Sequence, residues 1–162
     1  MEVKFKPLRE DFKLPEQATE GAAGFDLRYY GDTPVTFKNA GQVEIMDLGF
    51  SMELPPGYEA QIRPRSGLAA KYGLTVLNSP GTIDADYRGP VKAILVKVGV
   101  AKLVSTDADN YKPEILPEIT IEPGDRVCQM VIQPVPEVRL SLASTVSDTE
   151  RGEGGFGSTG VK

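Results

Sequence analysis

Short runs in which apolar and polar residues alternate recur along the chain, as is typical of β-strands with one buried face. The apolar positions of the clearest runs are Val3 and Phe5; Leu48, Phe50, Met52 and Leu54; and Tyr58, Ala60 and Ile62. Val43 and Ile45 are out of phase with the run that begins at Leu48, which predicts a β-bulge between them. Because 17 Gly and 13 Pro separate these runs at close intervals, the pattern predicts an all-β sandwich or barrel.

The second half of the chain predicts further strands and a single short helix. Residues 91–98 are apolar on both faces, as expected for a strand that is buried on both sides. Residues 119–121 and 127–135 are also predicted strands, with a turn at 123–125 between them. The helix is expected to begin with Ser66 as its N-cap and to end with Gly73 as its C-cap.

Two segments stand apart from this pattern of short strands. Residues 99–118 form a polar, Pro-containing connection that is longer than an ordinary loop, and both an ordered excursion and a simple surface insertion fit it. Residues 151–162 are rich in Gly, Ser and Thr and have no apolar period, as is typical of a flexible tail. The chain of 162 residues is therefore expected to hold one β domain, residues 1–150, followed by a C-terminal arm, residues 151–162.

Composition narrows the class of protein. Apolar residues make up 40% of the chain and charged residues 25%, and no apolar stretch approaches the length of a membrane span. The start of the chain alternates like a strand and does not resemble a signal peptide, so we expect a cytoplasmic protein, or one of the host cytoplasm if the source is viral. The net charge of -5 argues against a protein that binds nucleic acid through its phosphates, but arginines gathered in one place can still bind a small polyanion.

The absence of histidine limits the chemistry that the chain can perform. Triads that depend on histidine are excluded, and zinc would find too few suitable ligands. A general base must then be a carboxylate, a lysine or a tyrosine, and a metal would be a hard cation bound by oxygen. The single cysteine, Cys128, lies in an apolar run and is expected to be a buried thiol.

Five segments combine residues that can carry chemistry. The first, 23–27, contains Asp26, and the second, 64–68, places an arginine and a hydroxyl at the predicted helix start, where free N–H groups favour anions. In the third, 78–89, turn-forming residues predict a hairpin, and Asp84 and Asp86 would face the same side of an extended chain. The fourth, 124–130, carries a polar Gln129 in an apolar strand, and the fifth, 151–160, is a glycine-rich loop with an arginine and an aromatic ring. Each segment alone is explained equally well by a turn, a capped helix or a frayed tail.

Together, and in this order, the five segments resemble the five motifs of the trimeric dUTPase family (deoxyuridine 5′-triphosphate nucleotidohydrolases). The resemblance runs from residue 23 to residue 160. It implies a distorted β-sandwich of jelly-roll type and a homotrimer whose active sites are shared between subunits. The glycine-rich arm would close over the site of a neighbouring subunit.

The resemblance also implies a reaction, the hydrolysis of dUTP to dUMP and pyrophosphate by attack of water on the α-phosphorus. Asp84 would activate the water as a general base, and Arg151 would reach the γ-phosphate as an arginine finger. Mg²⁺ would bridge the phosphates, with Asp26 holding the hydrated ion through water. Such an enzyme limits the incorporation of uracil into DNA and supplies dUMP for the synthesis of dTMP.

The other motif residues would bind the substrate. Those expected at the phosphates are Arg65, Ser66, Gly67 and Gln129. Those expected at the uracil are Asn78, Gly81, Thr82 and Ile83, with Phe156 as a cover and with Gly157 and Ser158 beside it in the arm. Tyr87 would pack under the deoxyribose and exclude a 2′-hydroxyl, and Lys92 on the following strand is expected to touch the substrate as well.

Two alternatives accompany this prediction. A dCTP deaminase shares the fold, but the run from Asp84 to Gly89 and the complete tail favour dUTPase. A dUTPase scaffold could also bind a regulatory protein through residues 99–118, a connection that is longer than expected for the family. Phe25, where the family often has Tyr, is a second departure from its pattern.

Overall fold

A computed structural model of the protein describes residues 1–99, 101–105 and 111–155, and the side chains of 1–99 and 115–155. The first strands are β1 (Lys4–Pro7), β2 (Glu16–Gln17), β3 (Phe25–Arg28), β4 (Val35–Phe37), β5 (Val43–Asp47), β6 (Phe50–Glu53) and β7 (Tyr58–Arg63). After helix α1 (Ser66–Tyr72) come β8 (Leu74–Val76), β9 (Gly81–Ile83), β10 (Lys92–Lys97), β11 (Ala101–Ser105), β12 (Tyr111–Ile115), β13 (Ile119–Ile121) and β14 (Arg126–Pro134).

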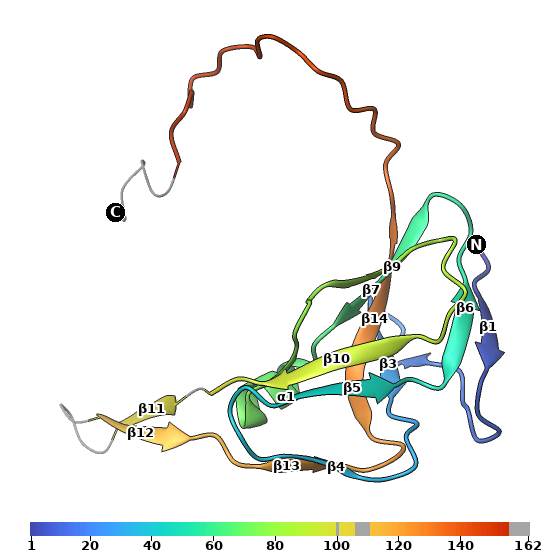
Figure 1. Cartoon of the computed structure of the whole chain (residues 1–162), viewed down its shortest axis with the longest axis vertical. Coiled ribbons are helices and arrows are strands. Elements are labelled where there is room, and N and C mark those ends of the chain that lie inside the picture. Colours follow the sequence, from blue (N-terminus) through green and yellow to red (C-terminus); the bar gives the residue numbers. More distant parts are fainter. Residues whose placement is uncertain (100, 106–110, 156–162) are drawn as a thin grey trace.

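The strands form one larger and several smaller antiparallel sheets, and all of these except the β11-β12 pair lie around a common core (Figure 1). The larger sheet has the strand order β2-β3-β14-β7-β9, and the next has the order β5-β10-β8. The pairs β1-β6 and β13-β4 complete the body, with Phe37, Met46 and Phe50 among the fully buried side chains. This arrangement confirms the predicted all-β class with one short helix, in a distorted sandwich of jelly-roll type.

The predicted bulge after Val43 and Ile45 is wrong. These two side chains are 44% and 65% exposed because they lie on the outer face of β5, whereas Met46 on the same strand is buried. The phase changes because β5 ends at Asp47 and the chain turns through Gly49, at a φ of 77°, into a strand of a different sheet. A register shift instead lies in β14, between Arg126 and Cys128.

The strand predicted over residues 91–98 is β10, but it is not buried on both sides in the single chain. Ala93 and Leu95 face the core, whereas Ile94 and Val96 on the outer face are only half-buried. Apolar residues thus occupy both faces of β10, although its outer face is partly exposed to solvent in the single chain.

The turn around residues 78–81 does not form the predicted hairpin. β8, before the turn, pairs with β10, whereas β9, after it, pairs with β7. The turn therefore carries the chain from one sheet to another. Local sequence cannot distinguish these two cases because both need the same turn-forming residues.

Helix α1 has the predicted C-cap but not the predicted N-cap. Gly73 adopts the left-handed conformation, with φ 63° and ψ 26°, and its N–H donates to the carbonyls of Leu68 and Ala69. The N-cap is Arg65, with no side-chain hydrogen bond across the helix start, and Ser66 is the first helical residue. The N–H groups of the first turn are therefore not capped by the side chain of the N-cap residue.

The connection 99–118 contains an ordered excursion. β11 and β12 pair with each other in an antiparallel register from Ala101 opposite Ile115 to Ser105 opposite Tyr111. In Figure 1 this pair projects from the lower left of the body. At the other end of the chain, the segment after β14 leaves the body and arcs above it. Within the described residues, helices that combine the length and the apolar character needed to cross a bilayer are absent.

Cys128 provides a test of the core. Its side chain is fully buried, and desolvation raises the pKa of its thiol from 9.0 to about 12. Because the thiolate is the reactive species, we expect the folded protein to resist iodoacetamide at pH 8, and the protein unfolded in urea to gain one adduct by mass.

The same pKa sets the direction of a pH effect on stability. A folded-state pKa above the unfolded value stabilises the fold fully below about pH 9, and this contribution is lost as the pH rises towards 12. Cys128→Ala should therefore show a shallower loss of stability over this range in urea titrations. Rapid alkylation of the folded protein, or equal slopes for the two proteins, would contradict a buried neutral thiol.

Candidate functional site

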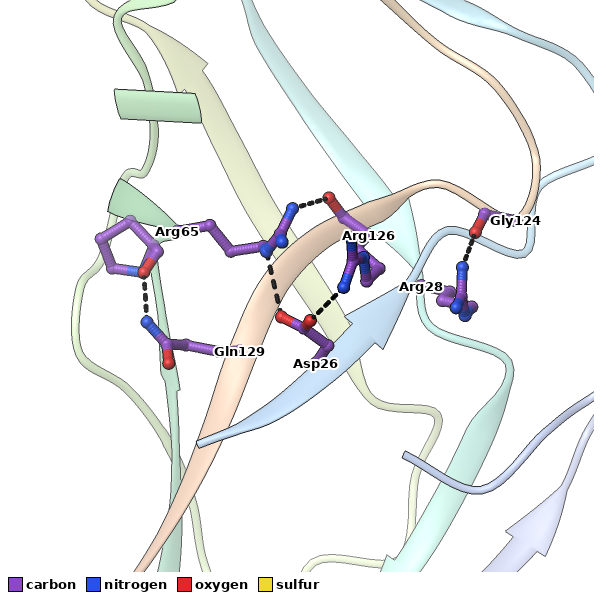
Figure 2. A network of polar contacts seen from close by, with 7 residues as sticks. Asp26, Arg28, Arg65, Gly124, Arg126 and Gln129 are labelled. Atoms are coloured by element: carbon purple, nitrogen blue, oxygen red, sulfur yellow. Dashed lines mark hydrogen bonds and ion pairs between the residues drawn. The ribbon is translucent and has the colours of Figure 1, made fainter. Parts of the chain in front are cut away.

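The side chain of Asp26, on β3, joins three of the five segments. One carboxylate oxygen accepts a hydrogen bond from Nε of Arg65 at 3.0 Å, and the other accepts from Nη1 of Arg126 at 2.9 Å. Arg65 also donates from Nη1 to the backbone carbonyl of Arg126 at 3.1 Å. Figure 2 shows both guanidinium groups converging on the one carboxylate. Residues 39 and 100 positions away from Asp26 in the sequence are thus tied to it.

This network carries an excess of positive charge. Asp26 is 21% exposed at its side chain, and Arg65 is 28% exposed, so the pair between them is only partly screened by solvent. One carboxylate faces two guanidinium groups, which leaves a net charge of about +1 in the cluster at neutral pH. A local cationic site of this kind suits a polyanion even though the whole chain has a charge of -5.

The register shift in β14 explains why the side chains of Arg126 and Gln129 point to the same side of the sheet. Arg126 pairs with Arg28, whereas Cys128 pairs with Leu27, so Val127 is the extra residue of a bulge. Strict alternation would put residues 126 and 129 on opposite faces of the strand. The bulge buries both residues between them and aims Arg126 and Gln129 into one pocket.

Gln129 is held by segments that are distant in the sequence. Its Nε2 donates to the carbonyl of Pro64 at 2.9 Å, directly before Arg65. Its Oε1 lies against Gly24, where a Cβ would collide with it. Gly24 is therefore required by this close approach, which joins the first segment to the fourth.

These residues line one open pocket of about 380 Å³, which we call the arginine pocket. It is lined by Ala18, Asp26, Arg65, Ser66, Gly67, Leu68, Lys71, Tyr72, Arg126 and Gln129. The structure thus brings together Asp26, predicted at the metal, and every residue predicted at the phosphates except Arg151 of the arm. Arg126 and Lys71 are additions that the sequence did not predict as site residues. Arg126 lies close to Gln129 in the sequence, and its charge could have indicated a site residue. In a regular strand, however, the two side chains would lie on opposite faces.

A second pocket, of about 500 Å³, surrounds Asp84, and we call it the aspartate pocket. It is lined by Ile45, Thr82, Ile83, Asp84, Tyr87, Pro90, Lys92 and Ile94. The ring of Tyr87 is held by a hydrogen bond from its hydroxyl to the carbonyl of Pro90 at 3.1 Å. The predicted residues Thr82, Ile83, Tyr87 and Lys92 thus gather around the predicted base.

Asn78 and Gly81 lie together but outside the lining of this pocket. The amide nitrogen of Asn78 lies 3.2 Å from the position that a Cβ on Gly81 would take. Gly81 is buried and pairs with Ile62 of β7. Their place is at the start of β9, beside the residues that line the pocket.

The sequence predicted that Asp84 and Asp86 face the same side of the chain, and this prediction is wrong. The chain turns after Asp84, whose carbonyl accepts a hydrogen bond from the N–H of Tyr87 at 3.2 Å. Asp86 instead lines a different pocket, together with Lys4, Glu53 and Arg88. Among the side chains that are described, no group of three His, Cys, Asp or Glu residues is placed to hold a metal ion.

The two pockets have no lining residue in common. β3, which carries Asp26, and β9, which precedes Asp84, are separated in the sheet by β14 and β7. Three strand spacings correspond to about 14 Å. Within one chain, the residues predicted to bind phosphates and the predicted base therefore form two separate sites.

The described part of the C-terminal arm, residues 151–155, lines neither pocket of the single chain. Arg151 is exposed, and its Nε donates to the carbonyl of Gly154 at 2.8 Å. Phe156, Gly157 and Ser158 lie outside the described residues. The predicted roles of the arm residues thus stay predictions.

Substitution of Gly24 tests the close approach to Gln129. Gly24→Ala should displace the Gln129 amide and cost about 1–3 kcal/mol through overpacking. We expect the melting temperature to fall by about 2–10 °C, measured by differential scanning calorimetry. Gly21→Ala is the matched control, because an added Cβ at Gly21 meets nothing within 4 Å. Equal melting temperatures for the two variants would show that the amide of Gln129 has room to move.

Comparison with known proteins agrees with this geometry. The dUTPase family model matches residues 10–109 and 116–160. A deoxyuridine 5′-triphosphate nucleotidohydrolase of Hydrogenobaculum sp. (strain Y04AAS1) is 49% identical over 162 residues and covers 100% of both chains. One of Rickettsia bellii (strain OSU 85-389) is 47% identical over 99% of this chain and 96% of its own.

A solved structure has the same fold. The dUTPase of Staphylococcus bacteriophage 80alpha with dUpNHpp superimposes with a TM-score of 0.78, at 26% identity and over 99% of each chain. Sequence and structure comparisons thus point in one direction. With the family model matched over both pockets and the arm, this chain belongs to the dUTPase family.

Proposed function

We propose that this protein hydrolyses dUTP at the α-phosphorus to dUMP and pyrophosphate. The observation that carries the proposal is the pairing, within a dUTPase family member, of a cationic arginine pocket with a pocket built around one aspartate. Relatives that are named deoxyuridine 5′-triphosphate nucleotidohydrolases at 47–49% identity support the substrate and the reaction. The related deamination of dCTP finds no support in these names.

Asp84 is the general base in this proposal. Its carboxylate is exposed at the aspartate pocket, so a water molecule can lie within reach of it. In a chain without histidine, a carboxylate is the group that is ionised at neutral pH and able to accept the proton. Asp84 takes a proton from water as the water oxygen bonds to the α-phosphorus, and the bond from that phosphorus to the bridging oxygen of the diphosphate breaks.

The arginine pocket binds the phosphates. Arg65 and Arg126 present guanidinium groups that suit phosphate oxygens, and both are already oriented by Asp26. Gln129 is fixed by Pro64, and Ser66 and Gly67 lie at the uncapped start of α1. A site that is oriented before the substrate binds loses less free energy in ordering its own side chains.

Mg²⁺ fits this pocket as an ion brought by the substrate. Both oxygens of Asp26 are engaged by arginines, so this carboxylate suits a contact through water better than direct coordination. Mg²⁺ commonly keeps several waters and takes its other ligands from phosphates, which requires no cage of protein carboxylates. When bound, the ion would neutralise charge on the leaving diphosphate.

The turn before β9 selects the base and the sugar. Backbone groups from Gly81 to Ile83, with the Asn78 amide beside them, would pair with the uracil edge, and cytosine would leave such groups unpaired. The Tyr87 ring, held by Pro90, would lie against the deoxyribose and leave no room for a 2′-hydroxyl. Lys92 lines the same pocket and would touch the substrate.

We further propose that three copies of the chain assemble and share their active sites. The number three comes from the resemblance to the family, and three observations support an assembly. The two pockets are separate in one chain, and Ile45 and Val43 expose an apolar outer face on β5. After β14, Val138, Leu140, Leu142 and Val146 are 68–105% exposed, which is typical of a segment that packs on another chain.

The arm would then act on a neighbouring subunit. Arg151 stands free of both pockets of its own chain, in a segment that leaves the body. We propose that it supplies an arginine to the γ-phosphate of a neighbour's substrate, with Phe156, Gly157 and Ser158 following it over the uracil. The cytoplasmic location and a protein partner on residues 99–118 stay predictions.

Asp84 and Asp86 offer a matched pair of variants. Asp84→Asn should lower kcat for dUTP by about 10²–10⁴-fold, the usual worth of a general base, while the affinity for a non-hydrolysable dUTP analogue changes little. Asp86→Asn should leave kcat unchanged, because Asp86 lines another pocket. Pyrophosphate release and isothermal titration calorimetry measure the two quantities. Equal loss of turnover and binding in Asp84→Asn would make Asp84 a binding residue.

Mixed trimers test the shared site. A chain truncated before Arg151 and the Asp84→Asn chain should each be nearly inactive, yet trimers that contain both chains should recover about a third of the normal activity, because one of their three sites receives both intact groups. Co-expression with two affinity tags isolates the mixed trimers. If each chain used its own arm and its own aspartate, mixing would restore nothing.

A further inference from the structure

Lys97, at the end of β10, is a buried lysine outside both pockets. It is 4% exposed and belongs to the core face of a strand whose other inward residues are apolar. Its backbone is fixed against the segment before β5, because its N–H donates to the carbonyl of Gln42 at 3.0 Å and its carbonyl accepts from the N–H of Gly41 at 2.7 Å. Burial of an ammonium group is costly unless its hydrogens are bound, so its partners indicate what it does.

Its partners are two backbone carbonyls from different segments. Nζ donates to the carbonyl of Tyr72 at 2.8 Å and to that of Pro117 at 2.7 Å. Tyr72 is the last residue of α1, where a cation also interacts favourably with the helix dipole. Pro117 closely follows β12, so it marks the point where the excursion 99–118 returns to the body.

Helix α1 depends on such external contacts. It has seven residues, no fully buried side chain and no side-chain N-cap, and a helix this short is not stable by itself. Its start is fixed by Arg65 through Asp26, and its end is fixed by Lys97 through Tyr72. The helix and its N-cap nevertheless supply six of the residues that line the arginine pocket.

The end of the helix is packed closely against the same two segments. The carbonyl of Gly73 accepts a hydrogen bond from the N–H of Val98 at 2.7 Å. A Cβ on Gly73 would lie 2.8 Å from the carbonyl oxygen of Val98 and 3.1 Å from a methyl of Leu116. The end of α1, the end of β10 and the return of the excursion thus meet at one junction around Lys97.

We propose that Lys97 is a positioning residue for phosphate binding, which holds α1 in place and links it to the root of the excursion 99–118. The inference rests on the proposed function in one respect, that the arginine pocket receives the triphosphate. Lys97 touches no substrate. It acts through α1, because movement of Tyr72 is transmitted along two turns of helix to Arg65, Ser66 and Gly67.

The experiment separates the two pockets by the ligand that is used. Lys97→Met keeps the approximate length of the side chain but removes its ammonium group. The carbonyls of Tyr72 and Pro117 then lose the hydrogen bonds that Nζ donates. We expect the KM for dUTP and the inhibition constant of inorganic triphosphate each to rise about tenfold, as a small misplacement of a binding group produces. The inhibition constant of deoxyuridine, which occupies the aspartate pocket alone, should stay within about twofold because α1 lines no part of that pocket.

Two further variants complete the design. Lys97→Arg, which keeps the charge and the donors, should limit the loss of affinity for triphosphate to about threefold. Lys38→Met is the matched control, since Lys38 is exposed and lines neither pocket, and it should match the unmodified protein in every constant. Hydrogen exchange of residues 66–73 should be faster in Lys97→Met and unchanged in Lys38→Met, at temperatures well below each melting point.

The outcomes are distinct. A lower melting temperature with unchanged constants for dUTP and triphosphate would make Lys97 a purely structural residue and overturn the inference. If Lys97→Met does not fold, Lys97→Arg decides, because its longer side chain must shift one of the two carbonyls and raise the KM about threefold without affecting deoxyuridine. If Arg65→Ala also leaves the binding of triphosphate unchanged, the fault lies in the assignment of the arginine pocket and not in Lys97.

Discussion

The half-buried carboxylate of Asp26 is the group around which the rest of the arginine pocket is organised. It lies between Arg65 and Arg126, and without it the two guanidinium groups would repel each other across a short distance. With it, each guanidinium keeps a defined orientation and the cluster still carries a net positive charge. The same carboxylate thus fixes the cations and leaves them attractive to an anion.

Several features of the fold serve this one cluster. The bulge at Val127 turns Arg126 towards Asp26 and keeps Val127 and Cys128 in the core. Gly24 allows the amide of Gln129 to approach β3, and Gln129 in turn holds Pro64 beside Arg65. Helix α1 completes the pocket, held at its start by Arg65 and at its end by Lys97. A helix of seven residues thus gains from two ion-assisted contacts the order that its own sequence does not provide.

The separation of the two pockets gives the proposed assembly a physical purpose. β3 and β9 lie apart in the same sheet, so one chain presents the cations and the proposed base on two separate surfaces. An exposed apolar segment and a projecting arm remain when a single chain has folded. A shared site would explain both the separate pockets and the exposed arm, because copies of the chain can bring an arginine pocket, an aspartate pocket and an arm to one substrate.

The features that could be predicted from the sequence are those that depend on neighbouring residues. Alternation gave the all-β class, Gly73 gave the helix end, and the apolar run around Cys128 gave a buried thiol, because each is set within a few positions of the chain. The absence of histidine limited a general base to a carboxylate, a lysine or a tyrosine, and five ordered motifs indicated the family.

Contacts formed in the folded chain set which strands pair and where a side chain points. It put β8 and β9 in different sheets, turned Asp86 away from Asp84, and placed the bulge in β14 so that Arg126 joined the site. It also buried Lys97 at a junction that no local pattern marks. These outcomes depend on contacts between residues far apart in the sequence, such as the 100 positions between Asp26 and Arg126, and a period of two along a strand carries no information about them.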